Sequence, residues 1–103
     1  MSKINLGIIG GGQLGSMLSV AAKKLNIKTT IFCDDIDAPA QNFCDEFISG
    51  DYNDNKKILE FIKKVNVITY EFENIPYETL NELNKFKSVK PKPSVNRLIQ
   101  HRL

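Results

Sequence analysis

Residues 7–15 read GIIGGGQLG, an apolar run that ends in closely spaced glycines. The apolar run, residues 4–9, is typical of a short buried strand in a parallel sheet. The glycines contain the pattern G-x-G-x-x-G and are Gly10, Gly11, Gly12 and Gly15. Glycines permit a tight turn and close approach of a ligand, and the free N–H groups of a following helix favour an acceptor atom. We therefore expect a ligand-facing turn between a first strand and a first helix.

Strand and helix patterns alternate along the rest of the chain. Further strands are predicted at residues 28–33, 46–49, 67–70 and 88–90. Helices are predicted after residue 13, at 40–44, after a cap at Asn53 or Asp54, and from Pro76 to about residue 86. The alternation implies right-handed βαβ units. The expected fold is α/β and Rossmann-like, an open parallel sheet in the order 3-2-1-4-5 with helices on both faces.

Apolar residues at helical spacing predict which face of each helix is buried. In the first helix they are Leu14, Met17, Leu18, Ala21, Ala22 and Leu25. In the later helices they are Ile58, Phe61, Ile62, Val65, Leu80 and Leu83. Ser94 resembles a helix N-cap that opens a new apolar stripe. We expect residues 1–93 to form one domain, and residues 94–103 to begin the connection to a further domain of a longer protein.

Composition narrows the class of protein. The formal charge of +2 over 103 residues gives no sign of a nucleic-acid partner. No apolar run approaches the roughly 20 residues that a membrane span needs. Cys33 and Cys44 lack metal-ligand spacing, and we expect them to be reduced, small apolar side chains of a cytoplasmic protein. No metal site and no catalytic residue are predicted within the chain.

A second cluster of polar residues follows the strand at 67–70, in the segment TYEFENIP at residues 69–76. In the predicted strand order, Glu71 emerges next to the glycine loop, at the switch point where such sheets bind ligands. Its carboxylate could accept hydrogen bonds from ribose hydroxyls or from a substrate amine. Glu73 and Asn74 are secondary candidates that more simply serve the start of the next helix.

The glycine spacing is also compatible with a dinucleotide. An NAD site expects an acidic residue at the end of the second strand, and Asp34 or Asp35 fits this position. Two further loop motifs are interpreted as structural: DAPA at residues 37–40 starts a short helix, and GDY at residues 50–52 is a turn.

Taken together, these motifs resemble one family, N5-carboxyaminoimidazole ribonucleotide synthetase of the ATP-grasp ligases. The resemblance lies in GIIGGGQLG, DAPA, GDY and TYEFENIP in this order, and in QHRL at residues 100–103, where the family usually has Q-D-R-L. It implies that the full enzyme uses ATP, Mg²⁺ and bicarbonate to carboxylate the amine of 5-aminoimidazole ribonucleotide in purine biosynthesis. It also implies that Gly12, Gln13, Leu14 and Glu71 contact this substrate.

The same resemblance implies that ATP and Mg²⁺ are bound by regions beyond this chain, that the chain alone is inactive, and that the full protein is a homodimer. Two alternatives stay open. One is a regulatory Rossmann module that binds NAD or a nucleotide. The other is the related formate-dependent glycinamide ribonucleotide transformylase, whose loop usually carries Glu in place of Gln13.

Overall fold

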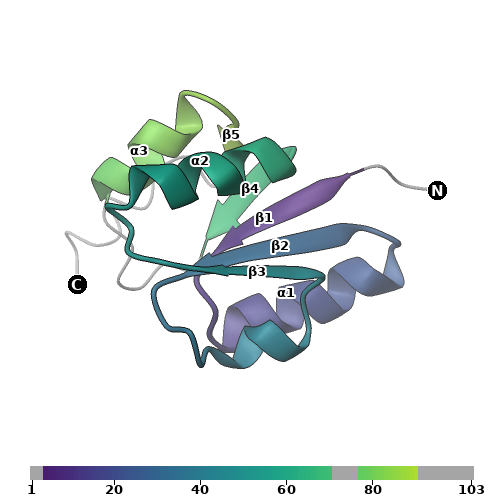
Figure 1. The fold of residues 1–103 in the computed structure, drawn as a ribbon. Helices are drawn as coiled ribbons and strands as arrows, with labels where there is room; N and C mark the ends of the chain where they lie inside the picture. Colours follow the sequence, from purple (N-terminus) through teal and green to yellow (C-terminus); the bar gives the residue numbers. More distant parts are fainter. Residues whose placement is uncertain (1–3, 71–76, 91–103) are drawn as a thin grey trace, which may run out of the picture.

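A parallel five-stranded sheet forms the centre of the computed structural model, which describes residues 4–70 and 77–90 (Figure 1). The strands are β1 (Asn5–Ile9), β2 (Lys28–Cys33), β3 (Glu46–Ser49), β4 (Val67–Tyr70) and β5 (Ser88–Val89). Their order is β3-β2-β1-β4-β5, and every neighbouring pair is parallel. The predicted Rossmann-like order 3-2-1-4-5 is therefore confirmed.

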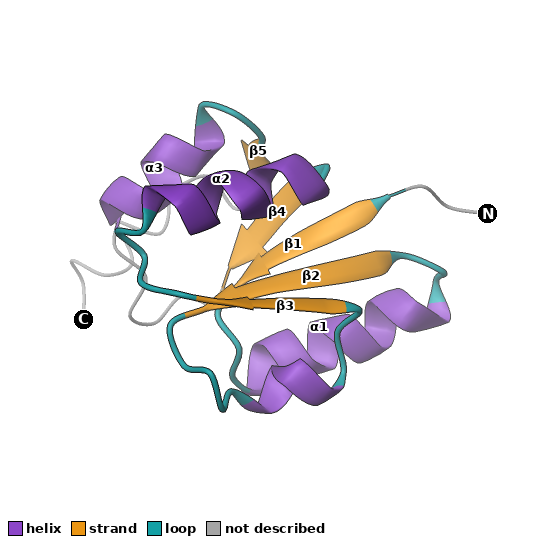
Figure 2. Ribbon diagram, viewed as in Figure 1, coloured by secondary structure: helices purple, strands orange, loops and turns teal. Residues whose placement is uncertain are grey.

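Helices cover both faces of the sheet, as predicted (Figure 2). Helix α1 (Gln13–Lys24) and the short 3₁₀ helix η1 (Pro39–Asn42) lie on one face, and α2 (Asn55–Lys64) and α3 (Tyr77–Asn84) lie on the other. The short helix predicted at residues 40–44 is thus a 3₁₀ turn that begins at Pro39. Asp54 caps α2, because its side chain accepts a hydrogen bond of 3.2 Å from the backbone N–H of Lys57.

The larger part of the core lies between the sheet and helices α2 and α3. Phe61 of α2 is fully buried, and its ring meets that of Phe32 edge to face, with centroids 5.8 Å apart. A Cβ atom on Gly7 would lie only 2.7 Å from Cζ of Phe61, so the glycine lets α2 approach β1 closely. Leu80 and Leu83 of α3 are also fully buried, as their spacing predicts.

The prediction of which α1 residues are buried is wrong for most of them. Met17 and Leu25 expose 60% and 68% of their surfaces, and Leu14 and Ala21 are exposed as well. Of the predicted set, Ala22 is buried and Leu18 is partly buried. The other residues that α1 buries are small: Gly15 and Ser19. Small side chains let the helix backbone approach the sheet, and the larger apolar residues consequently face outward.

We predict that Phe61→Ala lowers the free energy of unfolding by about 3–5 kcal/mol, since it removes a fully buried ring from a packed core. Leu59 is a matched control on the same helix, because its side chain is 48% exposed. Leu59→Ala is expected to cost less than about 1 kcal/mol. Urea unfolding followed by circular dichroism measures both, and equal losses would contradict this packing.

Candidate functional site

The candidate site lies at the carboxyl edge of the sheet. Ile9, the last residue of β1, pairs with Phe32 of β2 on one side and with Tyr70 of β4 on the other. The glycine loop follows Ile9 directly, and Glu71 is the next residue after Tyr70. The chain leaves β1 through α1 on one face of the sheet and enters β4 from α2 on the other face. The carboxyl edge at β1 and β4 is therefore the topological switch point, where open α/β sheets bind ligands.

Two backbone contacts fix the glycine loop to neighbouring segments. Gly10 has φ of 108°, a conformation that side chains disfavour, and its N–H donates a hydrogen bond of 2.8 Å to the carbonyl of Phe32. The carbonyl of Gly11 accepts a hydrogen bond of 3.0 Å from the N–H of Ala40. The loop is thereby attached to β2 and to η1 before α1 begins.

Gly11 is also the point of closest packing in the loop. A Cβ atom on Gly11 would lie 2.6 Å from Cβ of Ala38 and 3.2 Å from Sγ of Cys33. Ala38 and Ala40 are almost fully buried, at 3% and 0% exposed. The DAPA motif therefore packs against the glycine loop. The sequence indicated the start of a short helix here but not this contact, for which the small residues Ala38 and Ala40 were the available signal.

The residues that follow the glycines are available to a ligand. Gly12 is the N-cap of α1, and its carbonyl accepts the N–H of Ser16 at 3.0 Å. Gln13 and Leu14 are exposed on the first turn of the helix. The first N–H groups of a helix point beyond its end, and the amide of Gln13 can both donate and accept hydrogen bonds. This combination suits sugar hydroxyls or a heterocyclic base.

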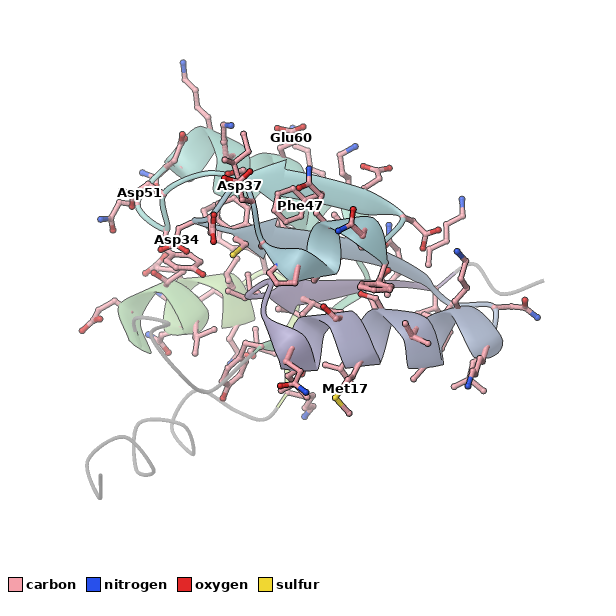
Figure 3. All side chains as sticks on the ribbon, turned by 90° about the horizontal axis from the view of Figure 1, so that it is seen from below. Met17, Asp34, Asp37, Phe47, Asp51 and Glu60 are labelled. Atoms are coloured by element: carbon pink, nitrogen blue, oxygen red, sulfur yellow. The ribbon has the colours of Figure 1, made fainter. Side chains whose placement is uncertain are left out.

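The acidic residues after β2 have unequal surroundings. The carboxylate of Asp35 accepts a hydrogen bond of 2.9 Å from the N–H of Asp37, so it belongs to the turn that leads into η1. Asp34 is exposed, and its carboxylate lies 3.8 Å from the thiol of Cys33, which donates to it. Asp34 and Asp37 lie on the same side of the molecule (Figure 3). Of the two acids that fit an NAD site, Asp35 is therefore engaged in local structure.

The loop after β3 is a second local turn. The side chain of Asp51 accepts the N–H of Asn53 at 2.9 Å, and its carbonyl accepts the N–H of Asp54 at the same distance. The N–H of Gly50 donates to the carbonyl of Cys33 at 3.1 Å. The GDY motif thus ties the end of β3 to β2 and leads the chain into α2, in agreement with its interpretation as a turn.

Cys33 acts as a packing group beside the glycine loop. Burial raises the pKa of its thiol, and the neighbouring carboxylate of Asp34 acts in the same direction. The pKa of Cys44 is also raised by burial, and both cysteines are free, although Cys44 is only partly buried. A raised pKa keeps a thiol protonated and unreactive. This supports the predicted role of Cys33 as a small apolar side chain.

The structure brings some of the predicted site residues together and leaves others undescribed. Gly10 and Gly11 contact the end of β2, which Asp34 follows, and Gly12 begins α1 directly after them. Glu71, Glu73 and Asn74 lie outside the described residues, as does the predicted helix start at Ser94. Within residues 4–70 and 77–90, no group of three His, Cys, Asp or Glu residues could hold a metal ion. No helix in those ranges is long and apolar enough to cross a bilayer.

We predict that Gly11→Ala lowers the free energy of unfolding by about 1–3 kcal/mol, because the added Cβ overlaps Ala38. Ala38→Gly removes the overlapping atom. The double variant should therefore recover part of the loss, which a double-mutant cycle of urea denaturation curves would reveal. Strictly additive losses would show that the two residues are not in contact.

Comparison with known proteins assigns the domain to a family. A parallel sheet of this order, with a glycine loop at its switch point, defines a Rossmann-like ligand-binding domain. The chain belongs to the ribonucleotide synthetase preATP-grasp domain family, which matches residues 1–100.

Several known proteins are similar to the chain over this domain. N5-carboxyaminoimidazole ribonucleotide synthase of Staphylococcus haemolyticus is 39% identical over 98 residues, which are 95% of this chain and 26% of that protein. The crystal structure of the synthetase from Thermus thermophilus has a TM-score of 0.87 and 32% identity, covering 92% of this chain and 26% of its own.

A structure of the Aspergillus clavatus synthase, in complex with ADP and 5-aminoimidazole ribonucleotide, has a TM-score of 0.79 and 29% identity. It covers 94% of this chain and 26% of its own chain. The chain thus spans about a quarter of the length of these synthases.

Proposed function

We propose that the chain is the ribonucleotide-binding domain of an ATP-dependent ligase. The ligase would carboxylate the amine of 5-aminoimidazole ribonucleotide with bicarbonate and form N5-carboxyaminoimidazole ribonucleotide, a step of purine biosynthesis. The observation that carries this proposal is the glycine loop at the switch point, in a domain that matches the ribonucleotide synthetase family over residues 1–100. The binding of 5-aminoimidazole ribonucleotide by the Aspergillus clavatus relative supports it.

In this proposal the glycine loop is a platform for the substrate: its backbone has no side chains at residues 10–12, so the substrate can lie directly against it. Gly12 leaves space for the sugar or base, and Gln13 and Leu14 contact it from the first turn of α1. Glu71 would accept hydrogen bonds from the ribose hydroxyls or the reacting amine. The anchoring of Gly11 by Ala38 and Ala40 keeps the platform rigid, so little ordering is needed when the substrate binds.

The chemical step needs groups that we assign to the rest of the ligase. ATP would activate bicarbonate as carboxyphosphate and release ADP, and the substrate amine would then attack the carbonyl carbon and displace phosphate. Cationic groups and Mg²⁺ stabilise the charge that develops in phosphoryl transfer. The nucleotide complexes of relatives about four times as long support the placement of these groups beyond residue 103. We therefore propose that the chain alone does not turn over ATP.

The longer protein is proposed to be a cytoplasmic homodimer in which residues 1–93 form the substrate domain and residues 94–103 begin the connection to the ATP-grasp part. A regulatory NAD-binding module is less well supported, because the family that matches residues 1–100 is that of ribonucleotide synthetases. Gln13 also favours the carboxylating enzyme over the formate-dependent transformylase.

We predict that Gly12→Val or Glu71→Ala in the full ligase raises the KM for the ribonucleotide about tenfold or more, and leaves the KM for ATP within about twofold. The introduced valine side chain would occupy the platform, and Glu71→Ala would remove a charged acceptor. Steady-state kinetics with each substrate varied in turn measures the two effects separately.

Glu82→Ala is the matched control, since Glu82 is an exposed acid on α3 whose side chain pairs with Lys85. It should change neither constant. Equal rises of both KM values in the Gly12 or Glu71 variants would contradict the assignment of the loop to the ribonucleotide.

A further inference from the structure

Each of the three consecutive glycines in the loop is held by a different element of the fold. The N–H of Gly10 donates to the carbonyl of Phe32 in β2 at 2.8 Å, and the carbonyl of Gly11 accepts the N–H of Ala40 in η1 at 3.0 Å. The carbonyl of Gly12 is held from within α1. Because a glycine backbone is otherwise unusually free to rotate, these contacts determine how rigid the loop is.

Ser16 holds Gly12 with two hydrogen bonds to one oxygen atom. Its backbone N–H donates to the carbonyl of Gly12 at 3.0 Å, and its hydroxyl donates to the same carbonyl, also at 3.0 Å. The first bond is the ordinary backbone bond of a helix and does not depend on the side chain. The second bond requires a hydroxyl at this position, so it is specific to the residue that the sequence places there.

Burial does not account for the second bond. Ser19 makes a similar bond, from its hydroxyl to the carbonyl of Gly15 at 2.8 Å, but Ser19 is only 1% exposed. A hydroxyl buried in this way needs a partner inside the protein. Ser16 is only partly buried, so water is an alternative partner for its hydroxyl. The consequence of its bond therefore lies at the acceptor, Gly12.

The peptide group that Ser16 holds also carries a donor at the candidate site. The carbonyl of Gly12 and the N–H of Gln13 belong to one planar peptide group, so a fixed oxygen also fixes the direction of the N–H. This N–H is among the first of α1, which have no partner within the helix. The first turn of α1 has no acidic residue, and its N-cap makes no side-chain hydrogen bond. In the described part of the chain, this N–H is therefore left for an acceptor atom of a ligand.

We propose that Ser16 is a positioning residue for the ribonucleotide. Its hydroxyl holds the peptide between Gly12 and Gln13 so that the N–H of Gln13 points at an acceptor oxygen of the substrate, which Ser16 itself does not touch. Without the hydroxyl, this peptide rotates more freely, and its ordering on binding lowers the affinity. The inference rests on the proposed function, because it takes the ribonucleotide as the ligand of the loop.

Kinetics of two Ser16 variants of the full ligase distinguish this role from a merely structural one. Alanine is a better helix former than serine, so Ser16→Ala should leave the midpoint of urea unfolding unchanged or raise it. It should nevertheless raise the KM for the ribonucleotide about three- to tenfold, the effect of one ordinary hydrogen bond, and leave the KM for ATP within about twofold. Ser16→Thr keeps a hydroxyl that can bond the same carbonyl, so both constants should stay within about twofold of the wild-type values.

Val20→Ala is the matched control, since Val20 lies one turn further along α1 and is 40% exposed. It should change neither KM more than about twofold. Amide ¹⁵N relaxation of the chain without ligand gives a readout that does not need the substrate. Ser16→Ala should lower the order parameter of the Gln13 amide, whereas Ser16→Thr and Val20→Ala should leave it unchanged.

Three results would overturn the role of Ser16. They are an unchanged ribonucleotide KM in Ser16→Ala, equal rises of this KM in the alanine and threonine variants, and an unchanged order parameter of the Gln13 amide in Ser16→Ala. Failure of the proposed function is recognised separately, because the wild-type ligase would then show no turnover of the ribonucleotide. That result would overturn the proposed function together with this inference.

Discussion

The close contact between Gly11 and Ala38 is the constraint on which the candidate site depends. A single Cβ atom at Gly11 would bring two side chains to 2.6 Å, well inside van der Waals contact. Because this atom is absent, the turn after β1 can lie directly on the turn after β2, where the carbonyl of Gly11 accepts the N–H of Ala40. Two loops that are separate in sequence therefore pack against each other at the carboxyl edge of the sheet.

The same preference for small side chains continues into α1. Gly15, Ser19 and Ala22 face the sheet, and the hydroxyl of Ser19 is satisfied by the carbonyl of Gly15 at 2.8 Å. The helix can then lie close to the strands with its N-terminus directed at the carboxyl edge. Its larger apolar residues are left on the outer side. Close packing of α1 on the sheet thus has a consequence for the surface of the molecule, since Leu14, Met17 and Leu25 stay exposed.

Much of the fold could be predicted from the sequence, because short apolar runs alternating with helical spacing restrict the topology to a few parallel sheets. The buried face of α1 could not be predicted in the same way. Periodicity finds an apolar face, but it does not say whether a helix turns that face or a stripe of small residues toward the sheet. The large residues Met17 and Leu25 dominated the pattern, and the structure exposes both. The candidate site was predictable only in part. Small residues such as Ala38 indicate close packing, but the sequence does not show that the partner is Gly11, which lies 27 positions away. The predicted role of Glu71 stays a prediction.

The interpretation of the site depends on whether the glycine loop receives a ribonucleotide and not a dinucleotide. A titration of the ¹⁵N-labelled chain, followed by two-dimensional NMR, with 5-aminoimidazole ribonucleotide and with NAD in parallel, distinguishes the two ligands. We expect the ribonucleotide to shift the amide signals of residues 10–14, while the signals of Lys23 and Lys24 at the far end of α1 stay in place. NAD should leave the loop signals unchanged at the same concentration. Saturable shifts of the loop by NAD, with none by the ribonucleotide, would contradict this interpretation.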